Sequence, residues 1–342
     1  MLALTNTKPI MRTIEEQALI QYEKIKRLPQ AGNWCQNIDS NPLKSQPGFL
    51  QKVKDIIKNY HVPNTVENLE TVINPMEYID IQHSLNIEEN FKKQDVAPIV
   101  AKAKALETVN TLYPLEQWTH VFTDGSLQNP EVGAGAGATC KLFSFYRSLG
   151  PYTTNFDGEV EAIKIALTQL LFQPNLFGKV VILTDSKAAI QAIINPEETP
   201  SFQIREIRQT LKHLKLLKKV VVLQWIPAHC GIHGNETADF LAKKGTEIKG
   251  STLRKLPLVS AKRLIKNENN KKHKLWINKE GENKSWKNLI ETPNIIPELP
   301  RKAAVASFRL LTGHDCLNHY LHRFKIKALR THQYVRYAHR MP

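Results

Sequence analysis

Hydrophobic and polar positions form a regular pattern between residues 118 and 245, and this pattern predicts an α/β unit. Short apolar runs have the length of buried strands, and the segments between them carry apolar residues at helical spacing. The predicted strands are 118–122, 133–139, 142–149, 179–184 and 220–226, and the predicted helices are 158–172, 186–194, 202–217 and 236–245. This order predicts a five-stranded mixed sheet, with an antiparallel hairpin edge and parallel strands, flanked by helices.

The segments on either side of this unit have weaker patterns. Apolar residues at helical spacing predict helices at 14–27 and 49–59, whereas residues 60–96 have weak periodicity, which predicts a linker or a loosely packed segment. We therefore expect three regions, with mainly helical extensions at both ends. They are a helical or loosely structured N-terminal extension at 1–115, a central domain at 116–248 and a basic, mainly helical tail at 249–342.

Charge is concentrated in the tail. The 342-residue chain carries 47 Lys and Arg against 32 Asp and Glu, which gives a formal net charge of +15. Residues 251–342 hold 20 of the basic and 6 of the acidic side chains. A basic segment beside a near-neutral domain predicts a polyanionic partner, with nucleic acid the commonest and a membrane surface the alternative. The predicted helix at 202–217 is also basic and is either a solvated face or a phosphate contact.

Composition excludes several other classes. No apolar run approaches the ~18 residues of a membrane span, and the first residues lack the apolar core of a secretion signal. The cysteines form no CxxC pair, which argues against a disulfide framework or a cysteine-rich zinc site. We expect a monomer in the nucleus or cytoplasm, without membrane contact and without zinc. The cysteines are Cys35, Cys140, Cys230 and Cys316, and the last has His314 and His319 nearby but no fourth ligand.

Four carboxylates stand at the ends or starts of the predicted elements. Asp124 ends the first strand and Asp185 ends the fourth, and ligands gather at the carboxyl ends of strands in open sheets. Glu159 and Asp239 lie on helices, at the edge of the face that packs on the core. Carboxylates that meet raise one another's pKa, and hard divalent cations such as Mg²⁺ or Mn²⁺ relieve the repulsion. The pattern predicts a two-metal site for phosphodiester hydrolysis.

Each of these elements alone has a simpler explanation. The TDGS sequence at 123–126 is a common turn, and Asp185 with Ser186 can form a helix N-cap. Glu159 can complement the positive end of a helix, and Asp239 can be a surface carboxylate. The ordered combination of all four on strands and helices favours the metal-site interpretation.

The segment from Trp225 to Lys243, WIPAHCGIHGNETADFLAK, makes the match specific. Together with TDGS at 123–126, NFDGEVEAI at 155–163 and LTDSKAAI at 183–190, it resembles the type 1 ribonuclease H domain. The closest resemblance is to the version carried by non-LTR (jockey-like) retrotransposon polyproteins. It implies a ribonuclease H-like fold and an endonuclease that hydrolyses the RNA strand of RNA–DNA hybrids with two Mg²⁺ ions, for which Mn²⁺ is a possible substitute.

The resemblance also assigns roles to individual residues. The metal-binding carboxylates of the family fall on Asp124, Glu159, Asp185 and Asp239. Its mobile histidine falls on His229, where it would shuttle a proton or help the product leave. Asn235 matches a supporting asparagine and can equally be a helix N-cap. Substrate contacts fall on Gly125, Ser126, Asn155, Ser186 and Asn235.

The flanks extend the resemblance to retroelement proteins. Residues 1–110 are similar to the helical tail that follows the polymerase, but the chain has no aromatic-x-Asp-Asp motif, so we expect no reverse transcription. Residues 307–326 resemble the segment that follows the nuclease. We therefore interpret the chain as a retroelement fragment lacking the polymerase. Two other functions stay open: a catalytically silent nucleic-acid-binding remnant, and a transposase or integrase, although those enzymes lack the HCGIHGNETAD segment.

Overall fold

The structure is a computed structural model that describes residues 7–28, 47–69, 80–87, 96–129, 131–196, 201–248, 255–282, 287, 299–312, 322 and 325. The chain forms two compact units. The larger one, the sheet unit, comprises Gln21–Lys52 and Val62–Leu264. The smaller one, the helical unit, comprises Met1–Ile20, Val53–His61 and Ile265–Pro342. Three helices contribute residues to both units: α1 (Ile10–Lys26), α3 (Phe49–Ile57) and α9 (Leu258–Gly281).

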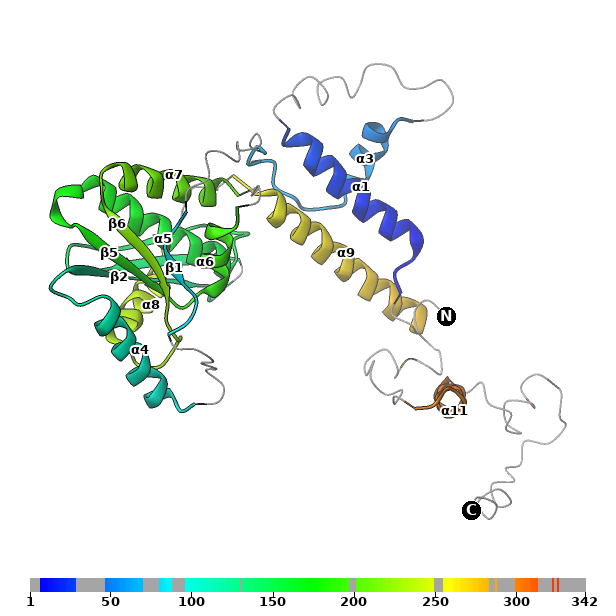
Figure 1. Cartoon of the computed structure of the whole chain (residues 1–342). Helices are drawn as coiled ribbons and strands as arrows, with labels where there is room; N and C mark the ends of the chain where they lie inside the picture. Colours follow the sequence, from blue (N-terminus) through cyan, green and yellow to red (C-terminus); the bar gives the residue numbers. More distant parts are fainter. Residues whose placement is uncertain are drawn as a thin grey trace, which may run out of the picture. The chain divides into compact units, whose positions relative to one another are not determined.

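A mixed sheet of six strands, counted over the described residues, forms the centre of the sheet unit (Figure 1). Its order is β1-β6-β5-β2-β3-β4, with parallel pairing from β1 to β2 and antiparallel pairing from β2 to β4. This confirms the predicted α/β class with its antiparallel hairpin edge. The strands are β1 His83–Ser84, β2 Trp118–Ser126, β3 Gly135–Thr139, β4 Ser144–Ser148, β5 Lys179–Thr184 and β6 Val220–Trp225.

The sheet differs from the prediction at two places. The predicted five strands become six because β1, which comes from the predicted linker, pairs with the outer side of β6. Two residues are too few to show any periodicity in the sequence. In addition, β2 continues through the predicted turn, since residues 123–126 pair with residues 135–138 of β3. Asp124 therefore lies within a paired strand rather than after it.

Helices cover both faces of the antiparallel part of the sheet. A Cβ atom on Gly125 of β2 would lie 2.3 Å from the backbone nitrogen of Glu159, so α5 (Asn155–Phe172) packs closely on that face. A Cβ atom on Gly137 of β3 would lie 2.3 Å from the carbonyl oxygen of Ala238, so α8 (His233–Thr246) packs closely on the other face. These approaches require glycine because any side chain would collide with helix backbone. The remaining helices of this unit are α4 Pro98–Leu112, the 3₁₀ turn Pro174–Leu176, α6 Lys187–Ile194 and α7 Phe202–Leu216.

The start of α5 brings Glu159 deeper into the helix than predicted. The sequence pattern placed the helix start at residue 158, whereas α5 begins at Asn155. Thr154 and Asp157 form a capping box in which each side chain accepts the other's backbone N–H. Because the box satisfies donors of the first turn, the helix begins three residues earlier.

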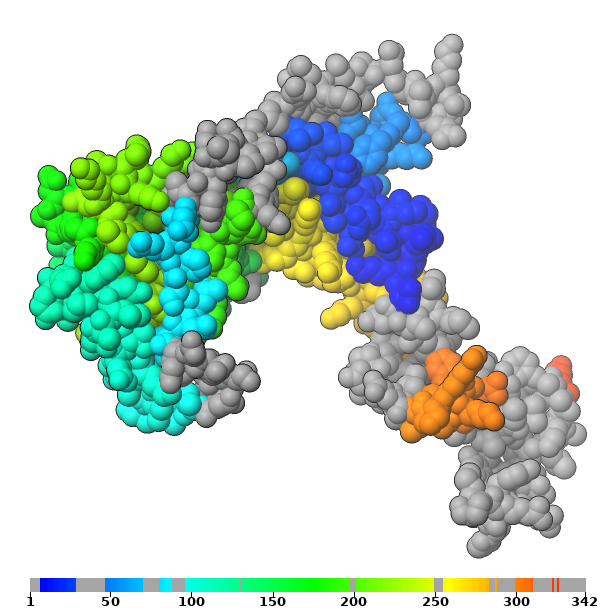
Figure 2. All heavy atoms as spheres, viewed as in Figure 1, coloured from blue at the N-terminus to red at the C-terminus, as the bar shows by residue number. Residues whose placement is uncertain are grey.

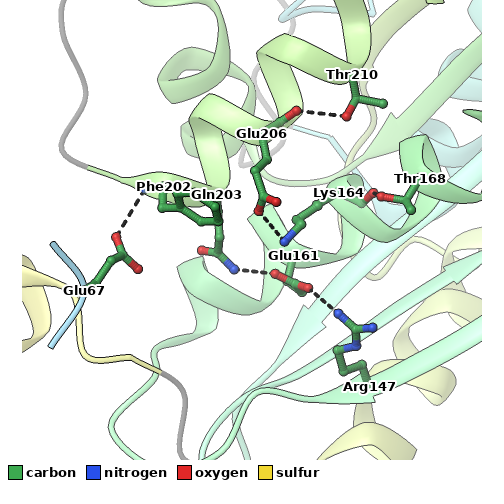
Figure 3. Close-up of polar contacts among 9 residues, drawn as sticks. All are labelled: Glu67, Arg147, Glu161, Lys164, Thr168, Phe202, Gln203, Glu206 and Thr210. Atoms are coloured by element: carbon green, nitrogen blue, oxygen red, sulfur yellow. Dashed lines mark hydrogen bonds and ion pairs between the residues drawn. The ribbon is translucent and has the colours of Figure 1, made fainter. Parts of the chain in front are cut away.

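A buried carboxylate joins α5 to α7 and to β4 (Figure 3). Glu161 of α5, 4% exposed, accepts hydrogen bonds from the guanidinium of Arg147, at 3.0 Å, and from the side-chain amide of Gln203. Nearby, Glu67 accepts the backbone N–H of Phe202 at 3.2 Å, in the first turn of α7 (Figure 3). A residue of the N-terminal extension therefore satisfies an end group of a helix in the central domain.

Segments from both extensions also pair with each other inside the sheet unit. Leu256 accepts the backbone N–H of Glu67 at 3.0 Å and donates its own to Thr65 at 2.9 Å. Arg27, fully buried, pairs with Glu23 and donates to the carbonyl oxygen of Leu256 at 3.0 Å. The extensions are thus bonded to one another next to the sheet.

The helical unit contains the first part of α1, the second parts of α3 and α9, and α11 (Arg301–Thr312). Asn269 of α9 donates to the carbonyl oxygen of Arg12 of α1 at 3.2 Å, so these two helices lie side by side (Figure 1). The Lys272 ammonium lies 3.7 Å from the centroid of the Tyr60 ring.

Several sequence predictions concern residues outside the described ranges, among them Cys35, His314, Cys316 and His319. Among the described cysteines, Cys140 is half-buried, Cys230 is buried, and neither forms a disulfide. A search of the described helices finds none whose length and apolarity suffice for a membrane crossing.

Candidate active site

Three of the predicted carboxylates meet at one place in the sheet unit. Asp124 comes from β2, Glu159 from α5, and Asp185 from the position after β5. One carboxylate oxygen from each lies within 4.8 Å of the other two. Asp124 is 4% exposed and Glu159 6% exposed, so two of the three are shielded from water. The parallel pairing of β2 with β5 explains why two of them meet, since both strands carry their acid towards the same sheet edge.

Burial and mutual repulsion raise the pKa of two of these carboxyls. The pKa of Asp124 rises from 3.8 to about 8, chiefly because burial disfavours its charged form and secondly because of the charges of Asp185 and Asp239. The pKa of Glu159 rises from 4.5 to about 9, again chiefly through burial and then through Asp185 and Asp124. A site that holds several carboxylates against such a penalty is typical of a cation site or of acid–base chemistry.

The fourth predicted carboxylate, Asp239, lies beside this cluster on α8. Asp124 pairs with Gly137 in the sheet, and α8 packs on the face of Gly137, so the Asp124 side chain points towards α8. Asp239 is within hydrogen-bonding reach of Asp124. It also forms an ion pair with Lys243, one turn later on the same helix, at 2.6 Å. Lys243 was not singled out in the sequence, although the i,i+4 spacing of an acid and a base on a helix predicts such a pair.

Short contacts fix the orientation of the buried carboxylates. The backbone N–H of Gly125 donates to Asp124 Oδ1 at 2.8 Å. The side-chain amide of Asn155 donates to Glu159 Oε1 at 3.2 Å, across one turn of α5. The second oxygen, Glu159 Oε2, is buried and has no hydrogen-bond partner within the described part of the chain. Gly125 and Asn155, both predicted to contact substrate, are therefore already bonded to the carboxylates.

The other residues predicted to contact substrate lie close to the carboxylates in the sequence. They differ in secondary structure, burial and hydrogen bonding. Ser186 is the N-cap of α6, and its hydroxyl accepts the backbone N–H of Ala189 at 3.2 Å. Ser126 is 8% exposed within β2. Asn235 is 3% exposed and lies inside α8, whose N-cap is Ile232, so the alternative explanation of Asn235 as an N-cap is wrong. Its Oδ1 is buried without a hydrogen-bond partner among the described residues.

His229 lies in the turn that joins β6 to α8. It is exposed and has a positive φ of 49°, and Gly231 follows with a φ of 81°. The left-handed backbone at His229 is uncommon for a residue with a side chain. The turn is anchored on the inner side by Cys230, whose thiol donates to the carbonyl oxygen of Pro227 at 3.2 Å.

Some cations of the basic segment 205–219, which comprises most of α7 and the turn after it, donate hydrogen bonds to carbonyl oxygens of the protein. Arg208 donates to the carbonyl oxygens of Ile193, at 2.8 Å, and of Ala192, at 3.1 Å, at the end of α6. Lys219 donates to the carbonyl oxygen of Phe177 at 2.7 Å. The predicted phosphate-binding surface here is therefore smaller than the sequence suggested. The cations that stay exposed at the end of α7 and in the following turn are Lys212, Lys215 and Lys218.

The carboxylate cluster lies in a segment that matches a known family. Residues 116–247 match the RNase H family model. The matched segment contains five strands of the sheet and helices α5 to α8, whereas β1 and α4 come from residues before it. A crystal structure of RNase H1 from the halophilic archaeon Halobacterium salinarum NRC-1 is similar, with a TM-score of 0.31 and 19% sequence identity. The similarity covers 37% of this chain and 96% of that chain. The fold of the chain is an RNase H-like α/β fold with helical segments on both sides of the domain.

Proposed function

We propose that this chain is a ribonuclease H, an endonuclease that hydrolyses the RNA strand of RNA–DNA hybrids. The observation that carries the proposal is the cluster of Asp124, Glu159 and Asp185, whose oxygens lie within 4.8 Å of one another inside an RNase H domain. Asp239, next to Asp124, supplies the fourth carboxylate. The motif resemblance supports an origin in a non-LTR retroelement, and we further propose action as a monomer in the nucleus or cytoplasm, where such hybrids occur.

The residues of the cluster fit divalent metal ions. All donors are carboxylate oxygens, which suit Mg²⁺ or Mn²⁺ rather than zinc. Glu159 Oε2 is buried without a partner among the described residues, which leaves a lone pair for a ligand. The raised pKa values of Asp124 and Glu159 indicate that the protein alone stabilises their charged forms poorly. When bound, two Mg²⁺ ions would supply positive charge that activates water and stabilises the leaving oxygen.

The chain's own residues would then hold and orient the reacting groups. Asp124, Glu159, Asp185 and Asp239 are the proposed ligands, and Asn155 holds Glu159 in place through its amide. His229, exposed in its turn, is proposed to carry a proton to or from the reacting phosphate and to help the product leave. Gly125, Ser126, Asn155, Ser186 and Asn235 remain the proposed substrate contacts, where recognition of the 2′-hydroxyl would distinguish RNA from DNA.

Cleavage of an end-labelled RNA–DNA hybrid by the full chain tests the proposal. We expect Mg²⁺-dependent cuts at internal positions of the RNA strand only, and EDTA should abolish them. Duplex DNA and duplex RNA of the same sequence serve as controls. Binding without cleavage would contradict the proposal in favour of a silent nucleic-acid-binding remnant, and cleavage of duplex DNA would favour a transposase or integrase.

We also propose that the exposed lysines of α9 contact the phosphates of the substrate. This helix has 24 residues and is therefore about 36 Å long. Arg263 and Lys272 are used internally, since they donate to the carbonyl oxygens of Tyr152 and Asn59. The basic residues that stay exposed along the helix are Lys262, Lys266, Lys271, Lys274 and Lys279.

Changing Lys271, Lys274 and Lys279 together to glutamine should weaken hybrid binding and flatten its salt dependence. The slope of log Kd against log salt is expected to fall by about 0.9 for each phosphate contact that is lost. Fluorescence anisotropy of a labelled hybrid at several salt concentrations measures this. The matched control changes three exposed lysines, namely Lys24 of α1, Lys52 of α3 and Lys58 directly after α3, and removes the same total charge. Equal slopes for the two triple variants would refute a specific role of α9.

A further inference from the structure

We infer that Asn86, which precedes the RNase H domain in the chain, is a positioning residue for Asp185. The inference rests on the proposed function, because Asp185 matters as a member of the carboxylate cluster. It assigns to the segment 80–87, which the sequence predicted to be a linker, a part in organising the active site. Three successive contacts connect Asn86 to Asp185, and a separate set of contacts holds the segment in the sheet.

The segment around Asn86 is built into the sheet unit. β1 pairs in parallel with β6, and the backbone N–H of Leu223 donates to the carbonyl oxygen of Gln82 at 3.0 Å. Ile81 and Ile87, on either side of β1, are 5% and 6% exposed and belong to the main hydrophobic core. The space-filling view shows this sky-blue segment lying directly against green residues of the domain (Figure 2). Its position is therefore determined by packing on both sides of Asn86.

The backbone of Asn86 is anchored by a side chain of the neighbouring strand. Gln224 of β6 donates from Nε2 to the carbonyl oxygen of Asn86 at 3.0 Å. Gln224 is itself fully buried, and its Oε1 accepts the hydroxyl of Tyr113 at 3.0 Å. A buried amide with both ends bonded is a rigid support, since any rotation would leave polar atoms unpaired. The support fixes the place from which the Asn86 side chain acts.

The side chain of Asn86 leads to Asp185 through two residues. Its Oδ1 accepts a hydrogen bond from the Lys187 ammonium at 3.1 Å. The same ammonium lies 4.1 Å from the centroid of the Trp225 ring, which is a close cation–π contact. The indole N–H of Trp225 donates to the carbonyl oxygen of Asp185 at 3.0 Å. Asn86 thus holds Lys187 over the ring, and the ring holds the backbone of Asp185.

These contacts act at a point where the backbone needs support. Asp185 lies between the end of β5 and the N-cap of α6, so it belongs to neither element. Its carboxylate has to stay within ligand distance of Asp124 and Glu159, which are fixed by β2 and α5. Outer residues that orient metal ligands typically change metal affinity or activity by about 10–100-fold when they are removed. Asn86, two contacts further out, belongs at the lower end of that range.

Asn86→Ala in the full chain tests the inference. We expect the Mg²⁺ concentration that half-saturates the stabilisation of the protein, followed by thermal unfolding, to rise about 10-fold. The Mg²⁺ dependence of hybrid cleavage should shift equally, while the KM for the hybrid stays unchanged. Asn86→Asp keeps an acceptor for Lys187 and should restore the wild-type values. Asn110→Ala, at another exposed asparagine before the domain, is the control and should match the wild type.

Trp225→Phe tests the same series of contacts between Asn86 and Asp185 independently. It keeps a ring under Lys187 but removes the N–H that bonds to Asp185, and it should produce the same shift in Mg²⁺ dependence. Combined with Asn86→Ala it should add little, because the two changes interrupt one chain of contacts. A lower melting temperature of Asn86→Ala with an unchanged Mg²⁺ midpoint would overturn the inference. If the wild type bound Mg²⁺ but cleaved no hybrid, the proposed function would fail, and the unfolding titration would still decide the role of Asn86.

Discussion

Asp185→Asn is expected to reduce hybrid cleavage by more than about 100-fold, since even the outer residues of metal sites typically account for 10–100-fold. The substitution replaces one carboxylate oxygen by an amide nitrogen, which cannot serve as an anionic ligand. It keeps the size of the side chain and the backbone carbonyl that accepts the Trp225 N–H, so the fold should be unaffected. Cleavage of labelled hybrid in Mg²⁺ measures the activity, and anisotropy measures the binding, which should stay within a few-fold of the wild type.

The control for this experiment is Asp55→Asn, the same chemical change at a carboxylate whose side chain is 80% exposed and forms an ion pair with Lys58. Such a surface pair contributes little, so activity should match that of the wild type. Asp124→Asn should fail in the same way as Asp185→Asn. If either site variant kept near wild-type activity in Mg²⁺, its assignment as a metal ligand would be wrong. If hybrid binding was lost along with cleavage, the residue would serve substrate binding instead.

Much of the sheet could be predicted because its strands are short buried runs with clear ends. The run KVVILT gave the bounds of β5 correctly, and five of its six residues are buried. The small-residue run at 133–139 predicted β3, and the reason for its composition appears only in the structure. Gly135 and Gly137 allow α8 to approach within van der Waals contact, which larger residues would prevent.

The sixth strand could not be predicted for a physical reason. β1 has two residues, and its stability comes from a partner about 140 positions later in the chain together with the buried Ile81 and Ile87. The residues of a short segment do not predict its pairing with a strand so far away in the chain. The same holds for Glu67, which bonds to Phe202 at the start of α7, and for Arg27, which bonds to Leu256. In contrast, the Thr154 and Asp157 pair was visible in the sequence as a capping box and could have given the start of α5.

The sequence predicted which residues belong to the candidate site better than it predicted how their side chains are arranged. Asp124 and Asp185 follow from strand order, since parallel neighbours bring their carboxyl ends together. The position of the Glu159 side chain depends on how closely α5 approaches Gly125. No pattern in the sequence reveals this distance. The contact between Trp225 and Asp185 is equally hidden, because it joins a strand end to a loop forty residues away. The roles of all these residues remain predictions until the variants are measured.

The pH dependence of stability provides a test of the site without any cleavage assay. Asp124 has a pKa of about 8 and Glu159 of about 9 in the folded protein without metal, against ordinary values of 3.8 and 4.5. Between these limits the folded state binds more protons than the unfolded state. The free energy of unfolding therefore falls as the pH rises from about 4 to about 9, by up to about 1.4 kcal/mol per pH unit for each group. Below about pH 4 the stabilisation of the protonated forms is fully present.

Asp124→Asn removes one of these groups and the charge that raises the pKa of Glu159. In EDTA, we expect the variant to be more stable than the wild type at about pH 8, by a few kcal/mol, with the difference shrinking towards about pH 5. Urea unfolding at several pH values measures this, and the difference between the two proteins cancels the titration of all other groups. Asp55→Asn should follow the wild type throughout.

Mg²⁺ should reverse the order of the two proteins. It binds the folded wild type through charged carboxylates, so it adds stability that grows with pH, whereas Asp124→Asn lacks one of the ligands and should gain less. The variant that is more stable in EDTA would then be the less stable one in saturating Mg²⁺ at about pH 8. Parallel pH profiles for both proteins in EDTA would show that Asp124 is charged and stabilised by the protein itself. In that case the carboxylates would not repel one another strongly enough to need a metal ion. The electrostatic argument for a metal site would then fail.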